Sequence, residues 1–300
     1  LPFAADAEIT MEANPGTIER GRFVGYAGAG VNRVSLGAQS FDAQALQRLG
    51  RIHSPDETRR AAAELHAAGL ANFNLDLMYG LPGHAPPQAL HDVMEALALA
   101  PAQVSHYSLT LEPGTPFAAM PPPDLPGDDA VEAMLEAARE CFVAAGFRRY
   151  EVSAWARAGR ECRHNLNYWR FGDYLGVGAG AHGKLTAARG APAIRRTLRL
   201  REPRRYLAQQ PAAVTVTPVA SVQMPFEFML NALRLVEGVE TELFERHTGQ
   251  PWSAVAATVE RLASRGLLEP PARGRLAPTA LGLRFLNEIL LEFLPAETGT

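Results

Sequence analysis

Residues 164–169, with the sequence His-Asn-Leu-Asn-Tyr-Trp, bring an imidazole, two carboxamides, a phenol and an indole into one short segment. A glycine-rich run at residues 176–183 follows closely. An imidazole can be an axial ligand to iron, and flat rings beside it can stack on a large planar macrocycle. The structural alternative is a packed aromatic turn with a hydrogen-bonded histidine. The rest of the chain has to decide between the two.

Composition narrows the classes of protein to consider. The 300 residues carry a net charge of -3 with a pI near 6.3, which argues against a nucleic-acid or membrane-surface binder. Cys141 and Cys162 are the two cysteines, too few for a disulfide framework or a metal site made of cysteines alone. No apolar run is long enough to span a bilayer and no signal peptide is evident, so we expect a cytoplasmic protein.

The elements that must position these side chains alternate between strand-like and helix-like segments, which is typical of an α/β fold with a parallel sheet. Ser54 followed by Pro55 and Glu57 predicts a helix start, and Gly69 predicts its end. Asp128 and Gly146 bracket another helix. The predicted strands are residues 8–13, 33–39, 72–79 and 104–111, with further extended runs at 150–155 and 174–177.

One side of the predicted strands is repeatedly polar. This parity predicts an open barrel whose lumen holds a polar ligand. The alternative, a sheet with one face in water, is weakened because parallel sheets are normally covered on both faces. The residues assigned to the polar side are Glu8, Thr10, Glu12, Arg33, Ser35, Gly37, Gln39, Asn74, Asp76, His106, Ser108, Thr110 and Glu112.

The last third of the chain has a different pattern. Seven arginines and a single acid lie between Arg189 and Arg205, which is either a solvated basic hairpin or a site for propionates, phosphates or an acidic partner. From residue 225 the pattern predicts a helix, a second helix at residues 253–264, two short strands at 267–269 and 275–277, and a helix capped at Thr279. This is the order of a winged helix. Residues 221–300 hold seven arginines against ten acids, so we expect a docking or lid domain that does not bind DNA.

Five motifs in this order carry a family resemblance. Each is weak alone, but together with the winged-helix tail they are specific. The chain closely resembles the HemW family of radical S-adenosylmethionine (SAM) heme chaperones, often labelled oxygen-independent coproporphyrinogen III oxidase-like, over essentially all of its length. The motifs are residues 11–17 (Met-Glu-Ala-Asn-Pro-Gly-Thr), 33–41, 49–51 (Leu-Gly-Arg), 74–83 and 164–169.

The resemblance implies an α/β fold: a partial (β/α) radical-SAM barrel lacking its first strands, followed by a C-terminal winged-helix-like domain. We expect barrel residues 1–185, a basic connector or hairpin at 186–220 and the winged helix at 221–300. The family binds a [4Fe-4S] cluster through a Cys-x-x-x-Cys-x-x-Cys loop, and Cys141 and Cys162 do not have this spacing. We therefore expect an N-terminally truncated chain that neither holds the cluster nor cleaves SAM.

The resemblance also implies a SAM site at the strand ends. Glu12 would bond the ribose hydroxyls or amino group, and Gln39 the polar edge of the ligand. Arg51 would pair with the methionyl carboxylate, because its planar fork accepts a bidentate partner. Asp76 would accept from a hydroxyl or ammonium donor.

By position alone, Thr110 and His182 would flank the adenine. The structural alternatives are a surface ion pair for Arg51 and a buried hydrogen-bond network for Asp76.

For heme, the resemblance implies contact through His164, as an axial ligand or as a group that organises the pocket. Asn165 would fix the imidazole, while Tyr168 and Trp169 would supply stacking area and donors for the propionates. Cys162 is a rival soft ligand.

Two functions follow from the resemblance. The first is a heme chaperone that binds SAM and heme and delivers heme to apo-hemoproteins of the respiratory chain, with transient contact to a membrane or membrane protein. The second is an oxygen-independent coproporphyrinogen III oxidase, which decarboxylates propionates through a 5'-deoxyadenosyl radical. Formation of a porphyrin product would discriminate them, so whether the chain is an enzyme stays open. A third alternative is an inert fragment with unpaired strand edges.

Overall fold

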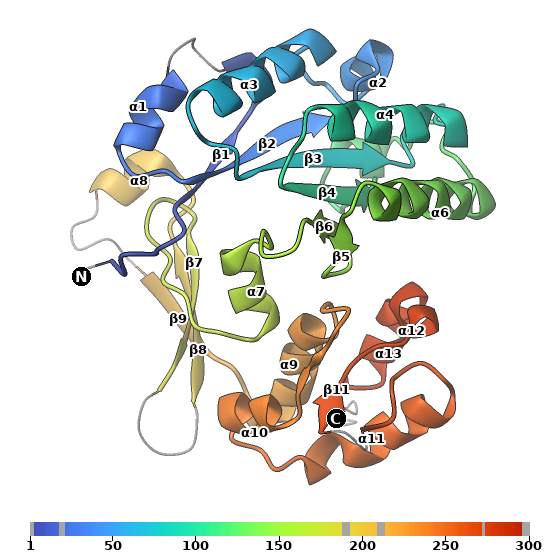
Figure 1. The fold of residues 1–300 in the computed structure, drawn as a ribbon. Coiled ribbons are helices and arrows are strands. Elements are labelled where there is room, and N and C mark those ends of the chain that lie inside the picture. The colour runs from blue at the N-terminus through green and yellow to red at the C-terminus, as the bar shows by residue number, and fades with distance from the viewer. Residues whose placement is uncertain (1–2, 18–21, 188–192, 209–213, 272–273, 296–300) are drawn as a thin grey trace. The chain divides into compact units, whose positions relative to one another are not determined.

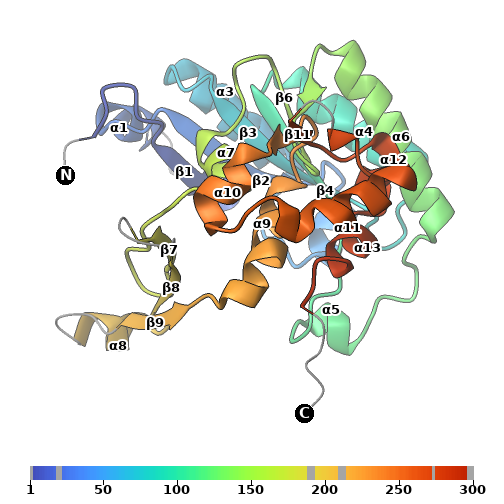
Figure 2. The ribbon, with the colours of Figure 1, turned by 90° about the horizontal axis from the view of Figure 1, so that it is seen from below.

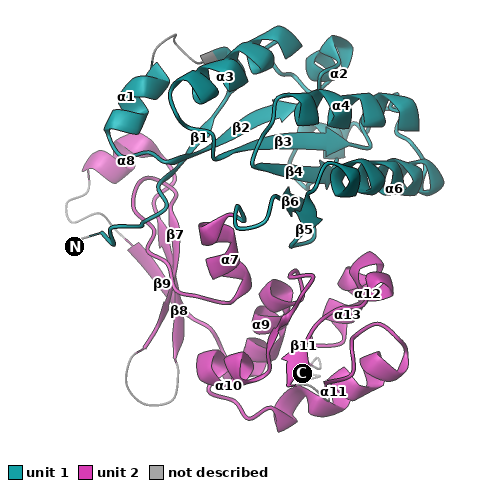
Figure 3. Ribbon diagram, viewed as in Figure 1, with its two compact units in different colours: residues 1–161 teal, residues 162–300 magenta. Residues whose placement is uncertain are grey.

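A computed structural model describes residues 3–17, 22–187, 193–208, 214–271 and 274–295. The chain forms two compact units, residues 1–161 and 162–300 (Figure 3). Each unit is described by itself. Within the described ranges, no helix combines the length and the apolar character that a bilayer crossing requires.

The first unit is built on a single mixed sheet (Figure 1). Strands β1 to β4 run parallel, and β6 is antiparallel to both β4 and β5. Parallel neighbours joined through helices make the expected βα units. The strand order is β1-β2-β3-β4-β6-β5, with β1 at Thr10–Ala13, β2 at Arg33–Gln39, β3 at Phe73–Tyr79, β4 at Gln103–Ser108, β5 at Arg148–Arg149 and β6 at Ala154–Ala156.

The helices of this unit connect the strands, and α4 and α6 lie side by side (Figures 1 and 2). The predicted helix start at Ser54 is confirmed, because its side chain accepts from Glu57 N while the Glu57 carboxylate accepts from Ser54 N. The bounds are α1 (Arg22–Gly28), α2 (Ala43–Arg48), α3 (Pro55–Ala67), α4 (Pro86–Ala98), α5 (Pro116–Ala119) and α6 (Asp128–Ala144), with a 3-10 turn η1 at Pro15–Thr17.

The hydrophobic core of this unit lies between the sheet and helices α1, α3, α4 and α6. Alternate residues of β2 and β3 enter it, since successive strand side chains point to opposite faces. The opposite face of the same strands is therefore free to carry polar side chains. The fully buried strand residues of the core are Val34, Leu36, Ala38, Phe73, Leu75, Leu77 and Val104.

Strand β4 corrects the predicted polar face. His106 was expected in the lumen, but it lies on the helix side, stacked on Tyr79 with ring centroids 4.4 Å apart and edge-on to Phe142. The pairing of β3 with β4 explains the difference. Asp76, on the polar face, pairs with Ser105, whereas Leu77, in the core, pairs with His106. Ser105 therefore lies on the polar face in place of His106. The alternation of polar and apolar residues along β4 did not indicate this.

The second unit begins with α7 (Arg163–Trp169) and an antiparallel sheet in the order β7-β8-β9. Gly176 and Gly183 lie close to each other, since a Cβ on Gly183 would come within 3.0 Å of Gly176 N. The extended run expected at 174–177 is reduced to one bridge, Tyr174 to Lys184. The strands are β7 (His182–Thr186), β8 (Ile194–Arg199) and β9 (Val214–Pro218), and α8 spans Pro203–Ala208.

The end of the chain follows the expected order only in part, because β10 and α10 precede α11 and the strand expected after it is reduced to one bridge, Leu268 to Pro278. The short strand near residue 275 pairs with β10. The helix predicted at 253–264 is confirmed as α11 (Ser253–Ser264), and Thr279 caps α12 by accepting from Gly282 N. The other elements are η2 (Ser221–Gln223), α9 (Met224–Ala232), β10 (Val239–Glu240), α10 (Glu242–Thr248), β11 (Arg275–Leu276), α12 (Ala280–Arg284) and α13 (Leu286–Leu291).

Candidate functional sites

A continuous polar network covers the inner face of β2, β3 and β4 in the first unit. Asn74 Nδ2 donates to Ser35 Oγ at 2.9 Å and to Asp76 Oδ1 at 2.8 Å. Ser35 Oγ donates to Asp76 Oδ2 at 3.2 Å, and Ser105 Oγ donates to Asn74 Oδ1 at 3.1 Å. The network fixes the Asp76 carboxylate in place, so this group could hold the polar part of a ligand without reorganising first.

Gln39 ends β2 in a left-handed backbone conformation, with φ at 66°. A non-glycine residue in this region is uncommon and is often found at functional sites. Its Oε1 accepts a hydrogen bond from Tyr107 Oη at 2.7 Å. The expected polar position of His106 would put its neighbour Tyr107 on the opposite face, and the same change of parity on β4 brings Tyr107 to the polar side.

The titratable groups of this face influence one another. Burial raises the pKa of Asp76, while hydrogen bonds from its neighbours and the positive charge of Arg51 act against the increase. Partial desolvation and, secondly, the charge of Asp76 raise the pKa of Glu12, although its side chain reaches solvent. Burial raises the pKa of Tyr107 to about 12. Glu12, Gln39, Arg51 and Asp76 thus belong to one electrostatic neighbourhood.

The two residues predicted to flank adenine, Thr110 and His182, belong to different units of the chain. Thr110 is exposed beyond the end of β4, where its hydroxyl donates to Glu112 Oε1 at 3.0 Å. His182 belongs to the second unit, on β7, and lines the pocket described below.

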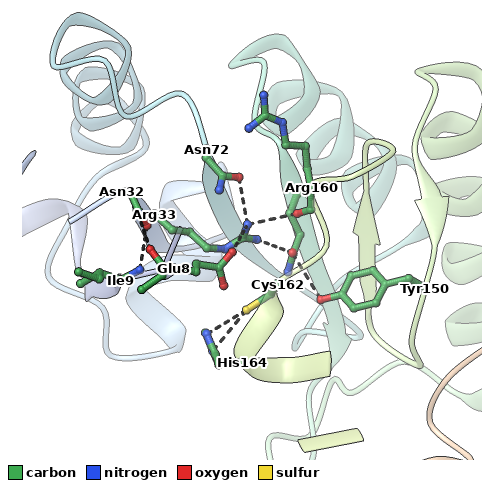
Figure 4. A network of polar contacts seen from close by, with 11 residues as sticks. Glu8, Ile9, Asn32, Arg33, Asn72, Tyr150, Arg160, Cys162 and His164 are labelled. Carbon is green, nitrogen blue, oxygen red and sulfur yellow. Dashed lines mark hydrogen bonds and ion pairs between the residues drawn. The ribbon is translucent and has the colours of Figure 1, made fainter. Parts of the chain in front are cut away.

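A second buried feature of the first unit was not singled out as a site by the sequence. Arg33 is 1% exposed, and its guanidinium donates to Asn72 Oδ1, to the Arg160 carbonyl and to Gln103 Oε1 (Figure 4). The Glu8 carboxylate lies 3.7 Å from it. A buried charge needs partners of this kind, and their number indicates a structural role in joining neighbouring strands.

The residues predicted to contact heme share helix α7 in the second unit. His164 and Tyr168 are four residues apart and meet edge to face, with centroids 6.0 Å apart. Cys162, which is buried at the N-cap position of the helix, places Sγ 3.0 Å from His164 Nδ1 (Figure 4). Asn165 lies half-buried on the same helix. A thiol beside an imidazole can orient the ring, so Cys162 belongs to the same cluster.

A cavity of about 420 Å³ opens beside this helix, within the second unit. Tyr168 and Trp169 form one wall, and His182, Lys184 and Arg196 contribute nitrogen atoms to the others. The Trp169 Nε1 is buried and makes no hydrogen bond among the described residues. A buried donor without an acceptor is costly, and a ligand that supplied one would remove the cost. The pocket thus combines flat aromatic surface with cationic donors, which suits a planar anionic ligand.

The cysteines do not fit a [4Fe-4S] cluster, which is held by cysteine thiolates. Cys141 lies on α6 and packs against the hydrophobic core of the first unit. Cys162 belongs to the second unit. These are the two cysteines of the sequence, and neither lies in a loop with the spacing such a cluster needs.

Comparison with known protein families finds one match near each end of the chain. The Radical SAM superfamily model matches residues 3–97, and the HemN C-terminal domain model matches residues 221–285. Heme chaperone HemW of Escherichia coli is 46% identical over 98% of this chain and 76% of that protein. The chain belongs to the HemW family. Heme chaperone HemW of Haemophilus influenzae is 44% identical, over 99% of this chain and 76% of its own length.

The chain is also similar to a mitochondrial protein of an animal and to a solved structure. The mitochondrial radical S-adenosyl methionine domain-containing protein 1 of Mus musculus is 34% identical over 97% of the chain and 68% of its own length. The structure of coproporphyrinogen III oxidase HemN from Escherichia coli matches with a TM-score of 0.77 and 21% identity, over 97% of this chain and 70% of that one. This likeness confirms the predicted α/β radical-SAM fold, and the HemW relatives confirm the family.

Proposed function

We propose that this chain is a heme chaperone that holds SAM on the polar face of β2 to β4, contacts heme through α7, and delivers heme to apo-hemoproteins. Its similarity to proteins named heme chaperone HemW supports the proposal. The observation that carries it is the cavity beside Tyr168 and Trp169, one helical turn from His164.

The heme contact is assigned to α7 because its side chains combine the required chemistries. His164 offers an imidazole, which is a common axial ligand to heme iron. Tyr168 and Trp169 offer flat surface in the pocket wall for the macrocycle. Cys162 holds the imidazole from one side through its contact with Nδ1.

For SAM, the assignment uses the charges of the first unit. The Arg51 guanidinium can pair with the methionyl carboxylate in a bidentate manner. Asp76 and Glu12 can accept from the ammonium or ribose hydroxyl groups, and Gln39 can bond the polar edge of the ligand. Because Cys141 and Cys162 do not have the spacing of a cluster site, no step of the proposal passes through a cluster.

The test is a titration of the purified chain with heme, followed by the Soret absorption band. We expect saturable binding that His164→Ala weakens at least about tenfold, since loss of an axial ligand removes a strong interaction. His91→Ala is the matched control, because His91 is an exposed histidine on α4. Heme transfer to apomyoglobin, measured by its own spectrum, tests delivery.

Two results would contradict the proposal. One is a folded wild-type chain that shows no saturable Soret change. The other is equal heme affinity of the His164→Ala and His91→Ala variants, which would remove α7 from the site.

A further inference from the structure

Lys184 is the single lysine in a chain with 28 arginines, and it is almost completely buried. It stands on β7 and lines the cavity beside α7. Its ammonium donates to the Phe171 carbonyl at 2.8 Å and to Asp173 Oδ1 at 3.1 Å, and it lies 4.1 Å from the centre of the Phe171 ring. The chain's one compact cation is therefore held rigidly in a pocket wall.

The ammonium keeps donor capacity for a ligand. A lysine has three N–H donors, and the two bonds above use two of them. Burial lowers the pKa of Lys184, while the charge and hydrogen bond of Asp173 act against this decrease. The Asp173 carboxylate is also held by Thr186, through its amide at 2.8 Å and its hydroxyl at 2.8 Å.

Arg196 adds a second cation to the same cavity. Its guanidinium donates to Tyr174 Oη at 3.3 Å and to the Glu227 carboxylate. A guanidinium has five N–H donors, so further bonds remain available. Asp173 and Glu227 pair with the two cations from outside the cavity lining, and none of the described lining residues is acidic.

We propose that this cavity is a carboxylate-binding subsite in which Lys184 and Arg196 receive a propionate group of the heme. The inference rests on the proposed function and deepens it, because it names the part of the ligand that the pocket recognises. Charge-assisted hydrogen bonds are the strong ones, and two cationic donors, the buried Lys184 and the half-buried Arg196, fix both the position and the orientation of a carboxylate. The ring of Trp169 forms the neighbouring wall, where the porphyrin edge would lie.

The experiment compares heme with heme dimethyl ester, whose propionates carry no charge, in the same detergent. Affinities are measured from the Soret band for the wild type, Lys184→Met and Arg195→Met. Arg195 is the matched control, an exposed cation on β8 next to Arg196. The quantity compared is the ratio of the two affinities, because a variant that merely loosens the fold would weaken both ligands alike.

We expect the wild type and Arg195→Met to prefer the free acid roughly tenfold or more, and Lys184→Met to lose most of that preference. If Lys184→Met does not fold, Arg196→Met is measured in the same way and should also lose it. An unchanged ratio in the folded variant would overturn the inference. A wild type that binds acid and ester equally would overturn it while leaving heme binding established, whereas failure of both ligands to bind would overturn the proposed function as well.

Discussion

Ser40 Oγ donates a hydrogen bond to Asp92 Oδ2 at 2.7 Å, and this bond joins the end of β2 to α4. The Phe41 amide donates to the other carboxylate oxygen at 2.6 Å. Burial nevertheless raises the pKa of Asp92 to about 6, against these two bonds. His84 Nε2 lies 3.8 Å away, but burial lowers the pKa of His84, so the pair is not an ion pair at neutral pH.

Asp92 should therefore destabilise the fold as pH rises. Its pKa is higher in the folded chain than the ordinary 3.8, so its contribution is fully present below about pH 4 and is lost as pH rises through about 6. The loss is about 3 kcal/mol for a shift of this size. We expect Asp92→Asn, which is uncharged, to gain about that much relative to wild type between pH 4 and 7 in urea unfolding.

The control for this experiment is Asp129→Asn, an exposed carboxylate in the first turn of α6. It should follow the wild-type pH profile. If Asp92→Asn follows that profile too, the Asp92 carboxyl does not titrate abnormally.

His106 should act in the opposite direction. Burial beneath Tyr79 and Phe142 lowers the pKa of His106 to about 3. The contribution of neutral His106 to the free energy of unfolding is fully present above the ordinary pKa of 6.5. It is lost as pH falls toward 3, by about 1.4 kcal/mol per pH unit, because only the unfolded chain takes up the proton. His106→Phe keeps a flat ring in the stack and should flatten the acid side of the profile. The readout is the slope of unfolding free energy between pH 4 and 6, and an unchanged slope would show that His106 is not the cause.

Asp76 should be needed for SAM binding. Its carboxylate is held by Asn74 and Ser35, so Asp76→Asn removes the charge while keeping the shape. We expect SAM affinity, measured by titration calorimetry, to fall about tenfold or more, as for loss of a bond to a charged group. Affinity of the wild type should also fall as pH decreases through the raised pKa of Asp76. Asp129→Asn is the control and should bind SAM as the wild type does. If Asp76→Asn also binds SAM with wild-type affinity, SAM does not bind at Asp76.

The sequence predicted those elements whose formation depends on residues close together in the chain. The helix start at Ser54 needs only side chains within three residues, and the strand at Arg33–Gln39 follows from one run of alternating residues. The helix at 253–264 and the cap at Thr279 were predicted for the same reason. The family followed from motif order, which is a property of the sequence itself.

Strand pairing is not local, and the sequence failed there. Whether His106 or Tyr107 faces the polar network depends on the register of β4 against β3, and a shift of one residue exchanges the two faces. Because of this register, Tyr107 hydrogen-bonds Gln39 and His106 packs on Tyr79 in the core. His182 came to line the α7 cavity because β7 folds back in the second unit, at a distance along the chain that periodicity does not encode.

The sequence by itself determined the α/β class, the family and the residue types at each candidate site, because composition, caps and motifs act over short distances. Only the tertiary structure decided which of those residues meet. It grouped Gln39 with Tyr107, placed Lys184 and Arg196 around one cavity, and enclosed Asp92 and His106. The physical reason is that burial and the pairing of distant strands set the charge, pKa and donor capacity of each side chain. Both depend on contacts between residues far apart in the sequence.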